Sequence, residues 1–322
     1  MIYYFLIFIV SLFALSLSGP LVVDTLSRIA KYLGWREFVV GFFLIAFAAS
    51  LPNFVLGITA ALKGIPELSF GDVVGGNVVD LSLAVALVIL LSRVILPSEG
   101  TSRASALWSS AIAILPLLLI LDGELSRPDG LVLIFAFLLY ICWLFSKGER
   151  FKKPYDGIDP QPPLKAFKGF MKDLGRAAVG LLLLVFGAQG VVASSTLFAQ
   201  ALNVPLPVIG ILIIGLGNSL PEIYFAISSA KKGKTEMILG DLMGSVIVPA
   251  TLVLGIVVLI HPIRLDGFSA FVTARIFLVL AAILFYIAAR TGKRITRREA
   301  FVLLGLYIAF VAFEILFCHC GA

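Results

Sequence analysis

The chain has 322 residues, of which 60% are hydrophobic and only 14% are charged, and its formal net charge is +6. A soluble globular protein carries about 25% charged residues, so this composition indicates a protein that crosses a membrane several times. Three cysteines and two histidines form neither a disulfide framework nor a zinc-binding spacing.

Ten mostly apolar segments follow one another along the chain, and each is long enough to cross a bilayer as a helix. Five of them lie on each side of a segment rich in Lys, Pro and Gly. The sequence therefore predicts an all-α polytopic membrane protein with a first five-helix repeat at 1–147, a linker at 148–172 and a second five-helix repeat at 173–322. The predicted helices are 3–30, 37–63, 67–92, 104–121, 129–147, 174–200, 205–231, 236–260, 268–289 and 299–317.

One stretch occurs twice, at 46–88 and at 215–257, and the copies align without a gap at an offset of 169 residues. In both copies a Ser-Leu-Pro is followed, at the same spacing, by Lys-Gly, Glu, Gly-Asp and Gly. Internal repeats of this kind decide the architecture of a chain. Because each half has an odd number of helices, the second half enters the membrane from the opposite side. The prediction is thus two inverted repeats, an arrangement typical of secondary transporters.

The loops carry Lys and Arg very unevenly. With the N-terminus outside, the inner loops hold 21 of these residues and the outer loops hold only Lys63, Arg127 and Arg264. Positive residues concentrate in cytosolic loops. We therefore expect a cell-membrane protein with both termini outside and the linker in the cytosol. The net positive charge is then explained by the orientation of the chain in the membrane. Nothing in its distribution favours nucleic-acid binding.

Two prolines interrupt apolar segments at membrane depth. Pro52 lies in the second predicted helix and Pro221 lies at the equivalent place in the seventh. Proline lacks the backbone N–H that continues a helix, so we expect unwound backbone with free carbonyls near 48–49 and 217–218. Such backbone is tolerated in a membrane only where protein or a cavity satisfies it, and here its carbonyls would face a cation.

The third predicted helix carries a polar stripe. Asp72, Gly76 and Asp80 follow one another at intervals of four residues, so they lie on one helix face. The equivalent places in the eighth helix are taken by Asp241, Ser245 and Pro249. Small residues and prolines could serve helix packing alone, but packing does not explain the carboxyl groups of Asp80 and Glu222 at membrane depth, where charge is costly and usually functional.

These polar side chains offer carboxylate, amide and hydroxyl oxygens, which suit hard cations such as Ca²⁺, and softer metals are disfavoured because no Cys or His joins them. Asp80 and Glu222 together would neutralise one divalent ion. When that ion leaves, Na⁺ or protons must compensate the two buried charges, and this requirement is the physical basis of exchange. Asp72 and Asp241 are expected nearer the mouths of the pathway. The predicted cation ligands are Glu222, Asp80, Asn53, Ser50, Ser219, Asn218, Ser245, Asn77, Asp72 and Asp241.

Two pairs of segments carry a family resemblance. Residues 50–53 (SLPN) with 71–77 (GDVVGGN), and residues 217–222 (GNSLPE) with 240–245 (GDLMGS), resemble the α-repeats of the cation/calcium antiporter superfamily, in particular its prokaryotic sodium/calcium exchangers. The resemblance implies an alternating-access antiporter whose first and sixth helices slide over an eight-helix core. It also implies Ca²⁺ and Na⁺, or H⁺, as transported ions. No cofactor is expected, and the expected partners are inorganic cations and the lipid bilayer.

The sequence departs from the family pattern, which reads G-T-S-x-P-E in one helix and G-[ND]-x-x-G-S-N-x-x-[ND] in the next. Asn53 replaces a Glu, Ala49 and Asn218 replace the two Thr, Gly76 replaces a Ser, and Pro249 replaces an Asn or Asp. Loss of one bidentate Glu is expected to weaken Ca²⁺ binding and to remove at least one Na⁺ site.

Two other hypotheses follow from these departures: an antiporter for another cation such as Mg²⁺, Na⁺ or K⁺, or a transport-silent membrane scaffold or sensor. An enzyme is not expected, because the chain has no H-E-x-x-H, no G-x-S-x-G and no aspartate-rich prenyl motif.

Overall fold

The structure, a computed structural model, describes residues 2–32, 50–92, 101–146, 163–202, 206–231, 235–264, 272–290 and 295–318. Nearly all of these residues are helical, and the helices follow the predicted order along the chain. The helices of the first half are α1 (Ile2–Tyr32), α4 (Leu51–Leu62), α5 (Glu67–Val78), α6 (Val85–Ser92), α7 (Thr101–Leu119) and α8 (Arg127–Ser146). Those of the second half are α9 (Pro163–Leu202), α10 (Leu206–Ile209), α11 (Gly215–Lys231), α12 (Thr235–Val248), α13 (Leu254–Ile260), α14 (Val272–Arg290) and α15 (Arg297–Cys318).

Three predicted helices are each built from two α-helical parts joined by a π-helical segment. The segment η2 (Val79–Ala84) joins α5 to α6, η5 (Gly210–Ile214) joins α10 to α11, and η6 (Pro249–Val253) joins α12 to α13. A 3₁₀ turn, η3 (Ile120–Asp122), ends α7. Wider π-helical turns often mark functional sites, and the sequence reasoning did not foresee them.

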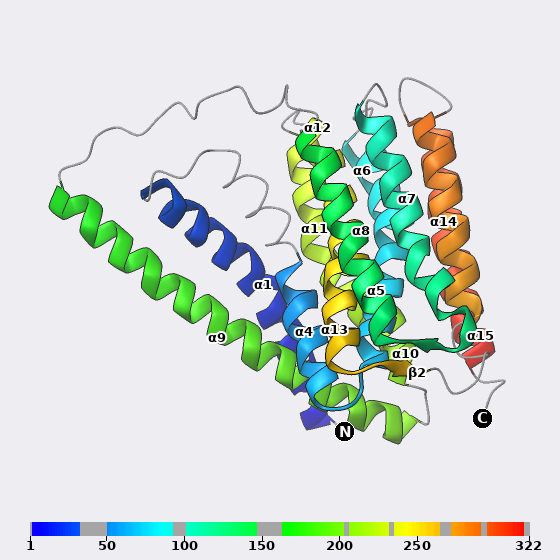
Figure 1. Ribbon diagram of the computed structural model, residues 1–322, viewed down its shortest axis with the longest axis horizontal. Coiled ribbons are helices and arrows are strands. Elements are labelled where there is room, and N and C mark those ends of the chain that lie inside the picture. The colour runs from blue at the N-terminus through cyan, green and yellow to red at the C-terminus, as the bar shows by residue number, and fades with distance from the viewer. Residues whose placement is uncertain are drawn as a thin grey trace.

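Equivalent helices of the two halves run in opposite directions. The helix α5–η2–α6 begins at the lower end of the bundle and ends at the upper end, whereas its repeat partner α12–η6–α13 begins above and ends below (Figure 1). This reversal is the inverted relation that the odd number of helices predicts.

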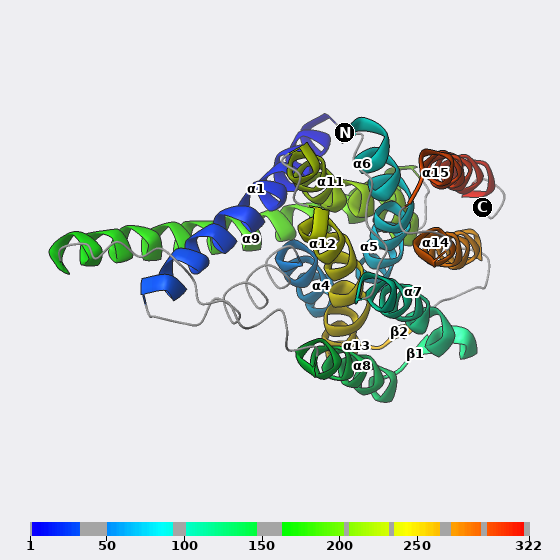
Figure 2. The same ribbon diagram turned by 90° about the horizontal axis from the view of Figure 1, so that it is seen from above.

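The helices α1 and α9 form an antiparallel pair that is inclined to the upright helices and lies on one side of them, opposite α14 and α15 (Figures 1 and 2). The pair is closely packed. A Cβ atom added at Gly190 of α9 would lie 2.0 Å from Oγ of Ser11 on α1, and one added at Gly187 would lie 3.1 Å from the Ser11 carbonyl. Small residues thus let the two long helices approach closely around Ser11.

The start of α9 differs from the sequence prediction. The helix begins at Pro163, whereas 148–172 was expected to be a loop and the helix was expected from 174. Proline is well accommodated in the first turn of a helix, where its missing N–H costs nothing, and apolar residues continue behind it. The remainder of the predicted linker lies outside the described residues.

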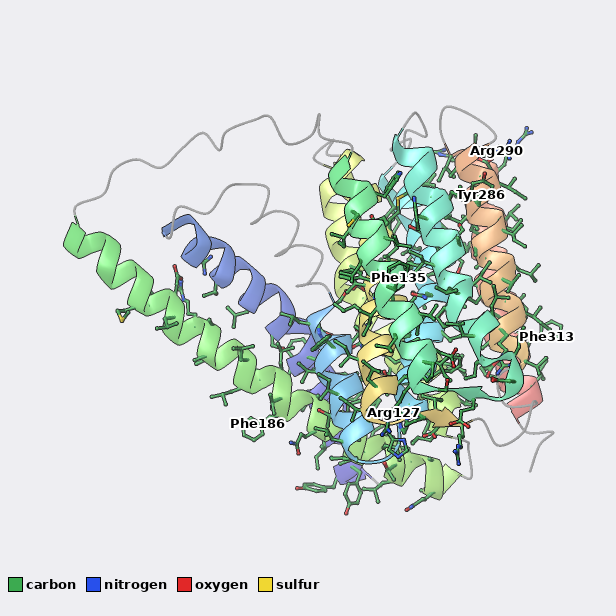
Figure 3. The ribbon with its side chains drawn as sticks, viewed as in Figure 1. Arg127, Phe135, Phe186, Tyr286, Arg290 and Phe313 are labelled. Carbon is green, nitrogen blue, oxygen red and sulfur yellow. The ribbon has the colours of Figure 1, made fainter. Side chains whose placement is uncertain are left out.

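A small β-ribbon adds to the predicted all-α architecture. The strands β1 (Glu124–Leu125) and β2 (Ile263–Arg264) pair antiparallel and link the two halves at the lower end of the bundle. Nearby, the Nε of Arg127 donates to the carbonyl of Leu259 at 3.2 Å. The three loops that the Lys and Arg count assigns to the outer face meet at this end, whereas Arg290 lies at the opposite end (Figure 3).

The outer surface is apolar. Phe186 on α9 is 70% exposed and Phe301 on α15 is 62% exposed, and labelled Phe186 and Phe313 point away from the bundle (Figure 3). Five of the described helical spans have the length and hydropathy of membrane-crossing helices, namely Glu67–Leu91, Met171–Ala201, Leu242–Ile260, Val272–Arg290 and Arg297–Leu316. Large exposed apolar side chains on such helices fit a lipid environment.

Candidate functional site

The candidate site lies where α5 of the first half meets η5 and α11 of the second. Glycines allow the two backbones to touch there. A Cβ atom added at Gly75 would lie 2.1 Å from the carbonyl oxygen of Ile211, and one added at Gly215 would lie 2.6 Å from the backbone N of Gly76. Any larger residue would push the helices apart. The close crossing brings the polar stripe of α5 directly against the polar segment of α11.

A buried hydrogen bond joins the two halves at this crossing. Nδ2 of Asn218 on α11 donates to Oδ1 of Asp72 on α5 at 3.0 Å. Asp72 is 1% exposed and Asn218 is 7% exposed. The second carboxylate oxygen of Asp72 and the amide oxygen of Asn218 are buried and have no hydrogen-bond partner. Asp72 is therefore buried inside the bundle in this structure, and its expected position nearer a mouth of the pathway stays a prediction.

Asp80 lies eight residues after Asp72 along the same helix face, in the π-helical segment η2. It is 3% exposed, and the hydroxyls of Ser219 on α11 and Ser245 on α12 hydrogen-bond to its carboxylate. Its Oδ1 atom is buried without a hydrogen-bond partner. The Ser245 Oγ also lies 3.0 Å from the carbonyl oxygen of Leu242, so its single hydrogen is shared between this carbonyl and the Asp80 carboxylate. Two hydroxyls from two helices of the second half thus lie beside one carboxylate of the first half.

Replacement of a family serine by Gly76 leaves room beside this group. A Cβ atom added at Gly76 would lie 3.8 Å from Oγ of Ser219, which is ordinary contact distance. The structure thus brings together five of the ten predicted ligands in two groups: Asp72 with Asn218, and Asp80 with Ser219 and Ser245.

The other predicted ligands are less fully defined. Ser50 is buried before the first turn of α4, and its hydroxyl has no hydrogen-bond partner. Asn77 is buried on α5, Asn53 is half-buried on α4, and Glu222 is half-buried on α11, one turn beyond Asn218. The helix α12 includes Asp241, whose side chain lies outside the described part of the structure.

The helix around Pro221 remains wound. The helix α11 is continuous from Gly215 to Lys231, so the unwound backbone expected at 217–218 is not found. Pro221 has no N–H to donate to the carbonyl of Gly217, four residues earlier. The backbone expected to open at 48–49 lies outside the described residues.

Other buried polar groups were missed by sequence reasoning. Ser69, at the start of α5, has a buried hydroxyl without a partner, and so do Ser194 and Ser195 on α9. Glu314 on α15 is 4% exposed and its Oε2 atom has no partner. A glutamate inside an apolar segment was a visible signal, but Glu314 lies outside the repeated stretch on which the sequence prediction concentrated.

The donor set of the site is oxygen only. Within the described ranges, no three side chains of Cys, His, Asp or Glu gather into a metal-binding group. A cation at this crossing would therefore be held by isolated carboxylates supplemented by hydroxyl, amide and backbone carbonyl oxygens, which is the ligand type of hard cations. Buried polar atoms without partners call for a ligand, an ion or water, and the atoms here are almost all acceptors.

Inverted halves, a membrane-facing apolar surface and buried acceptor oxygens at the crossing of the halves define a polytopic membrane transporter of ten spanning helices in two inverted five-helix repeats. A model of the sodium/calcium exchanger protein family matches the chain twice, at residues 3–146 and 173–316. The chain belongs to this family, and it is a membrane antiporter of the cation/calcium type.

Known relatives can be aligned with nearly the whole length of this chain. The chain is 28% identical to the sodium/calcium exchanger MaX1 of Methanosarcina acetivorans, over 95% of this chain and 97% of that one. It is 26% identical to the putative antiporter CaxA of Alkalimonas amylolytica, over 88% and 90%. A solved structure of the sodium-calcium exchanger NCX_Mj, soaked with Na⁺ and Sr²⁺, has a TM-score of 0.63 at 25% identity and covers 97% of this chain and 98% of that one.

Proposed function

We propose that this protein is a secondary-active antiporter that exchanges Ca²⁺ for Na⁺, or for protons, by alternating access across the cell membrane. The observation that carries the proposal is the set of buried oxygens without partners at the crossing of α5 and α11, in particular those of Asp72, Asp80 and Asn218. Desolvated acceptors that no protein donor satisfies are costly, and a dehydrated cation is the ligand that compensates carboxylate and amide oxygens together.

The proposed ligand set is the one that the sequence predicts. Asp80 and Glu222 supply the charge that neutralises a divalent ion, and neutral oxygens come from the hydroxyl and amide side chains around them. Hydrogen bonds from Ser219 and Ser245 hold the Asp80 carboxylate in place. Release of the ion would leave the buried carboxylate of Asp80 without the bound cation, which is unfavourable at membrane depth. Binding of Na⁺ or protons removes this penalty and so couples the two transport directions.

The inclined pair α1 and α9 is the proposed moving part. These helices pack on each other through Gly187, Gly190 and Ser11, and they contact the upright helices through α4 and α11. A pair that is tightly packed internally and touches the core over a narrower area can slide as a unit. Its movement would open the site to one side of the membrane and then to the other.

The experiment that tests the proposal is uptake of ⁴⁵Ca²⁺ into proteoliposomes loaded with Na⁺, repeated with a proton gradient in place of the Na⁺ gradient. We expect uptake that depends on one of the two gradients and that falls to background in Glu222→Gln. The matched control is Glu124→Gln, which makes the same chemical change in the β-ribbon at the end of the bundle. Wild-type uptake in Glu222→Gln would refute the assigned role of this carboxylate.

A second candidate is exchange of another cation. The observation that favours it is the replacement of a family Glu by Asn53 and of a family Asn or Asp by Pro249, which leaves fewer charges for a divalent ion. If neither gradient drives Ca²⁺ uptake, the same vesicles are to be tested with Mg²⁺, Na⁺ and K⁺. Absence of transport for all of them would favour the scaffold or sensor hypothesis.

We further propose repeats at 1–147 and 173–322 around a cytosolic linker at 148–172, with both termini outside. The uneven distribution of Lys and Arg supports this orientation, as does the gathering of Arg127 and Arg264 at the end where α1 begins and α15 ends. Labelling of Arg264→Cys by an impermeant thiol reagent from outside intact cells, with Arg290→Cys protected, is the expected result in a variant lacking the natural cysteines.

A further inference from the structure

A buried carboxylate on α9 joins the two helices of the inclined pair toward their upper end in Figure 1. Asp173 is 4% exposed. Its Oδ1 atom accepts a hydrogen bond from Nε of Arg28 on α1 at 3.0 Å, and Nη1 of Arg176 on α9 donates to the same atom at 3.4 Å. Nη2 of Arg28 also donates to Oγ1 of Thr25 at 3.2 Å, which orients the guanidinium. None of these residues belongs to the proposed cation site.

Two contacts hold α1 and α9 in register. The first is the glycine contact, where Gly190 of α9 lies against Ser11 of α1. The second is the ion pair of Arg28 with Asp173. Ser11 and Arg28 are 17 residues apart on α1, and so are Asp173 and Gly190 on α9, which corresponds to about 25 Å along each helix. Two helices joined at one point can pivot, whereas two helices joined at two such distant points move as one body.

Together the two helices contact both halves of the core. Helix α1 reaches α11 of the second half, where a Cβ atom added at Gly217 would lie 3.4 Å from the side chain of Leu12. Helix α9 packs on α4 of the first half, and Leu184 of α9 shares a buried apolar cluster with Leu56 of α4. Both α4 and α11 carry proposed cation ligands. To expose the ligands of both repeats to one side of the membrane, α1 and α9 must therefore move together.

The ion pair has no charged counterpart at the other end of α1 and α9. Carried into these helices, the repeat offset of 169 residues places Leu197 at the position of Arg28 and Tyr4 at that of Asp173. At that end two aromatic rings, one from each helix, meet edge to face with their centroids 5.4 Å apart. Apolar contact is non-directional, whereas a charge-assisted hydrogen bond has a defined geometry. The ion pair is therefore the more directional of the contacts at the two ends.

We propose that Asp173 is a positioning residue whose ion pair with Arg28 makes α1 and α9 one rigid body, so that movement of either helix carries the other during exchange. This inference rests on the proposed exchange function and names the contact that couples its moving parts. Arg176 has no share in the coupling, because it lies on the same helix as Asp173 and its ion pair joins no two helices.

Two arginines that reach one carboxylate provide a matched pair of variants. Arg28→Gln removes the charge that bridges the helices, and Arg176→Gln makes the same chemical change within α9. Both arginine side chains are partly exposed, at 41% and 47%, so neither change leaves a cavity. We expect Arg28→Gln to lower the maximal rate of ⁴⁵Ca²⁺ uptake into proteoliposomes about tenfold and to leave the equilibrium affinity for Ca²⁺ unchanged. Arg176→Gln should stay within about twofold of wild type in both measurements.

A covalent link in place of the ion pair is a sharper test. In protein lacking the natural cysteines, Arg28→Cys and Asp173→Cys together remove the ion pair and should transport as slowly as Arg28→Gln. A short bis-methanethiosulfonate reagent suits these positions, because an Arg–Asp pair separates the backbones further than a disulfide does. Cross-linking should restore uptake to nearly the rate of the cysteine-free protein, and a reductant should abolish the gain. Cross-linked protein that transports no faster, or not at all, would overturn the inference.

A second cross-link, with the opposite expected effect, is the control. Leu12→Cys with Gly217→Cys ties α1 to α11 when the same reagent is added. This link should stop uptake, and a reductant should restore it, because the rigid pair must move relative to the core. Uptake that survives the link would mean that the pair does not move against α11, and it would overturn the inference as well.

Hydrogen–deuterium exchange separates the inference from the proposed function, because it needs no transport. In detergent, Arg28→Gln should speed amide exchange where α1 and α9 carry Arg28 and Asp173, and Arg176→Gln should not. If this difference is found but wild-type protein moves no Ca²⁺ under either gradient, the coupling contact stands and the function is wrong. If wild-type protein exchanges Ca²⁺ and Arg28→Gln does so at the same rate, the inference is wrong and the function stands.

Folding of each variant is checked by size-exclusion chromatography. Asp173→Asn is the second variant should Arg28→Gln fail to fold. It removes the buried member of the ion pair, and the two partly exposed arginines can extend to the membrane surface. It should show the same loss of uptake rate at unchanged Ca²⁺ affinity. Uptake at the wild-type rate in folded Asp173→Asn would refute the positioning role.

Discussion

The two π-helical segments η2 and η6 occupy equivalent places in the two repeats and share a backbone geometry, but they carry different chemistry. In both, a hydroxyl donates to the carbonyl four residues earlier: Ser82 to Val78, and Thr251 to Ile247 at 2.5 Å. The ligand position, however, is Asp80 in the first segment and Pro249 in the second. Both repeats thus share the π-helical backbone, but only the first contributes a carboxylate at the ligand position.

Proline at position 249 changes the kind of oxygen that the second segment offers. It has no N–H to donate to the carbonyl of Ser245, four residues earlier. The side chain of Ser245 itself lies at the site, where its hydroxyl contacts Asp80. At this position one repeat therefore contributes a carboxylate and the other contributes a proline without a side-chain oxygen. The comparison predicts that equivalent substitutions in the two segments have unequal effects.

The largest effect is expected for Asp80→Asn. This change removes one of the two charges proposed to neutralise a divalent ion, and it leaves the hydroxyls of Ser219 and Ser245 in place. We expect exchange of ⁴⁵Ca²⁺ in proteoliposomes to fall at least about 100-fold, equivalent to about 2.7 kcal/mol. Pro249→Ala, the matched change in the other segment, should lower exchange less than about tenfold. Equal losses in both variants would contradict the unequal roles of the segments.

A second prediction concerns the crossing that holds the site together. In Gly75→Ala the new methyl group would lie 2.1 Å from the carbonyl oxygen of Ile211, and a backbone atom cannot move aside as a flexible side chain does. Overpacking of this kind costs about 1–3 kcal/mol. The thermal unfolding midpoint in detergent should fall clearly. Gly305→Ala on α15, where no described atom lies within 4 Å of the new Cβ, should leave it nearly unchanged.

Much of this architecture could be predicted from the sequence. Apolar length and the repeat offset gave the order of the helices, and the spacing of Asp72 and Asp80 placed both on one helix face. These predictions rest on properties local to one segment, and helix α9 shows the limit of such reasoning. Its first turn starts at Pro163 because proline tolerates that position, while the residues before it were expected to stay in the loop.

The pairing across the repeats could not be predicted. Nothing in either segment indicates that Asn218 bonds to Asp72, because the pairing depends on the depth at which glycines let the two helices cross. The same contact buries the Asp72 side chain, and local sequence gives no indication of this burial. The ligand roles of all ten predicted residues remain predictions, and binding experiments on the variants described here are their test.

A third prediction concerns a substitution that restores the missing carboxylate in the first repeat. Asn53→Glu returns the carboxylate that the family pattern places opposite Glu222. An additional charged ligand should tighten Ca²⁺ binding about tenfold, which corresponds to about 1.4 kcal/mol. The measurement is ⁴⁵Ca²⁺ binding at equilibrium in sodium-free buffer, and Asn53→Gln is the control of equal size without charge. If both variants bind alike, side-chain size rather than charge determines affinity at this position.

The smallest effect is expected where the repeats meet outside the apolar bundle. Nε of Arg264 lies 3.2 Å from Oε2 of Glu124 across the β-ribbon, but the side chains are 74% and 37% exposed. Exposed ion pairs contribute only about 0–1 kcal/mol, since water and salt screen them. Glu124→Gln should therefore change the unfolding midpoint by no more than 1–2 °C at physiological salt. A loss comparable with that of Gly75→Ala would mean that the ribbon, and not the crossing of α5 with α11, is the main contact holding the two repeats together.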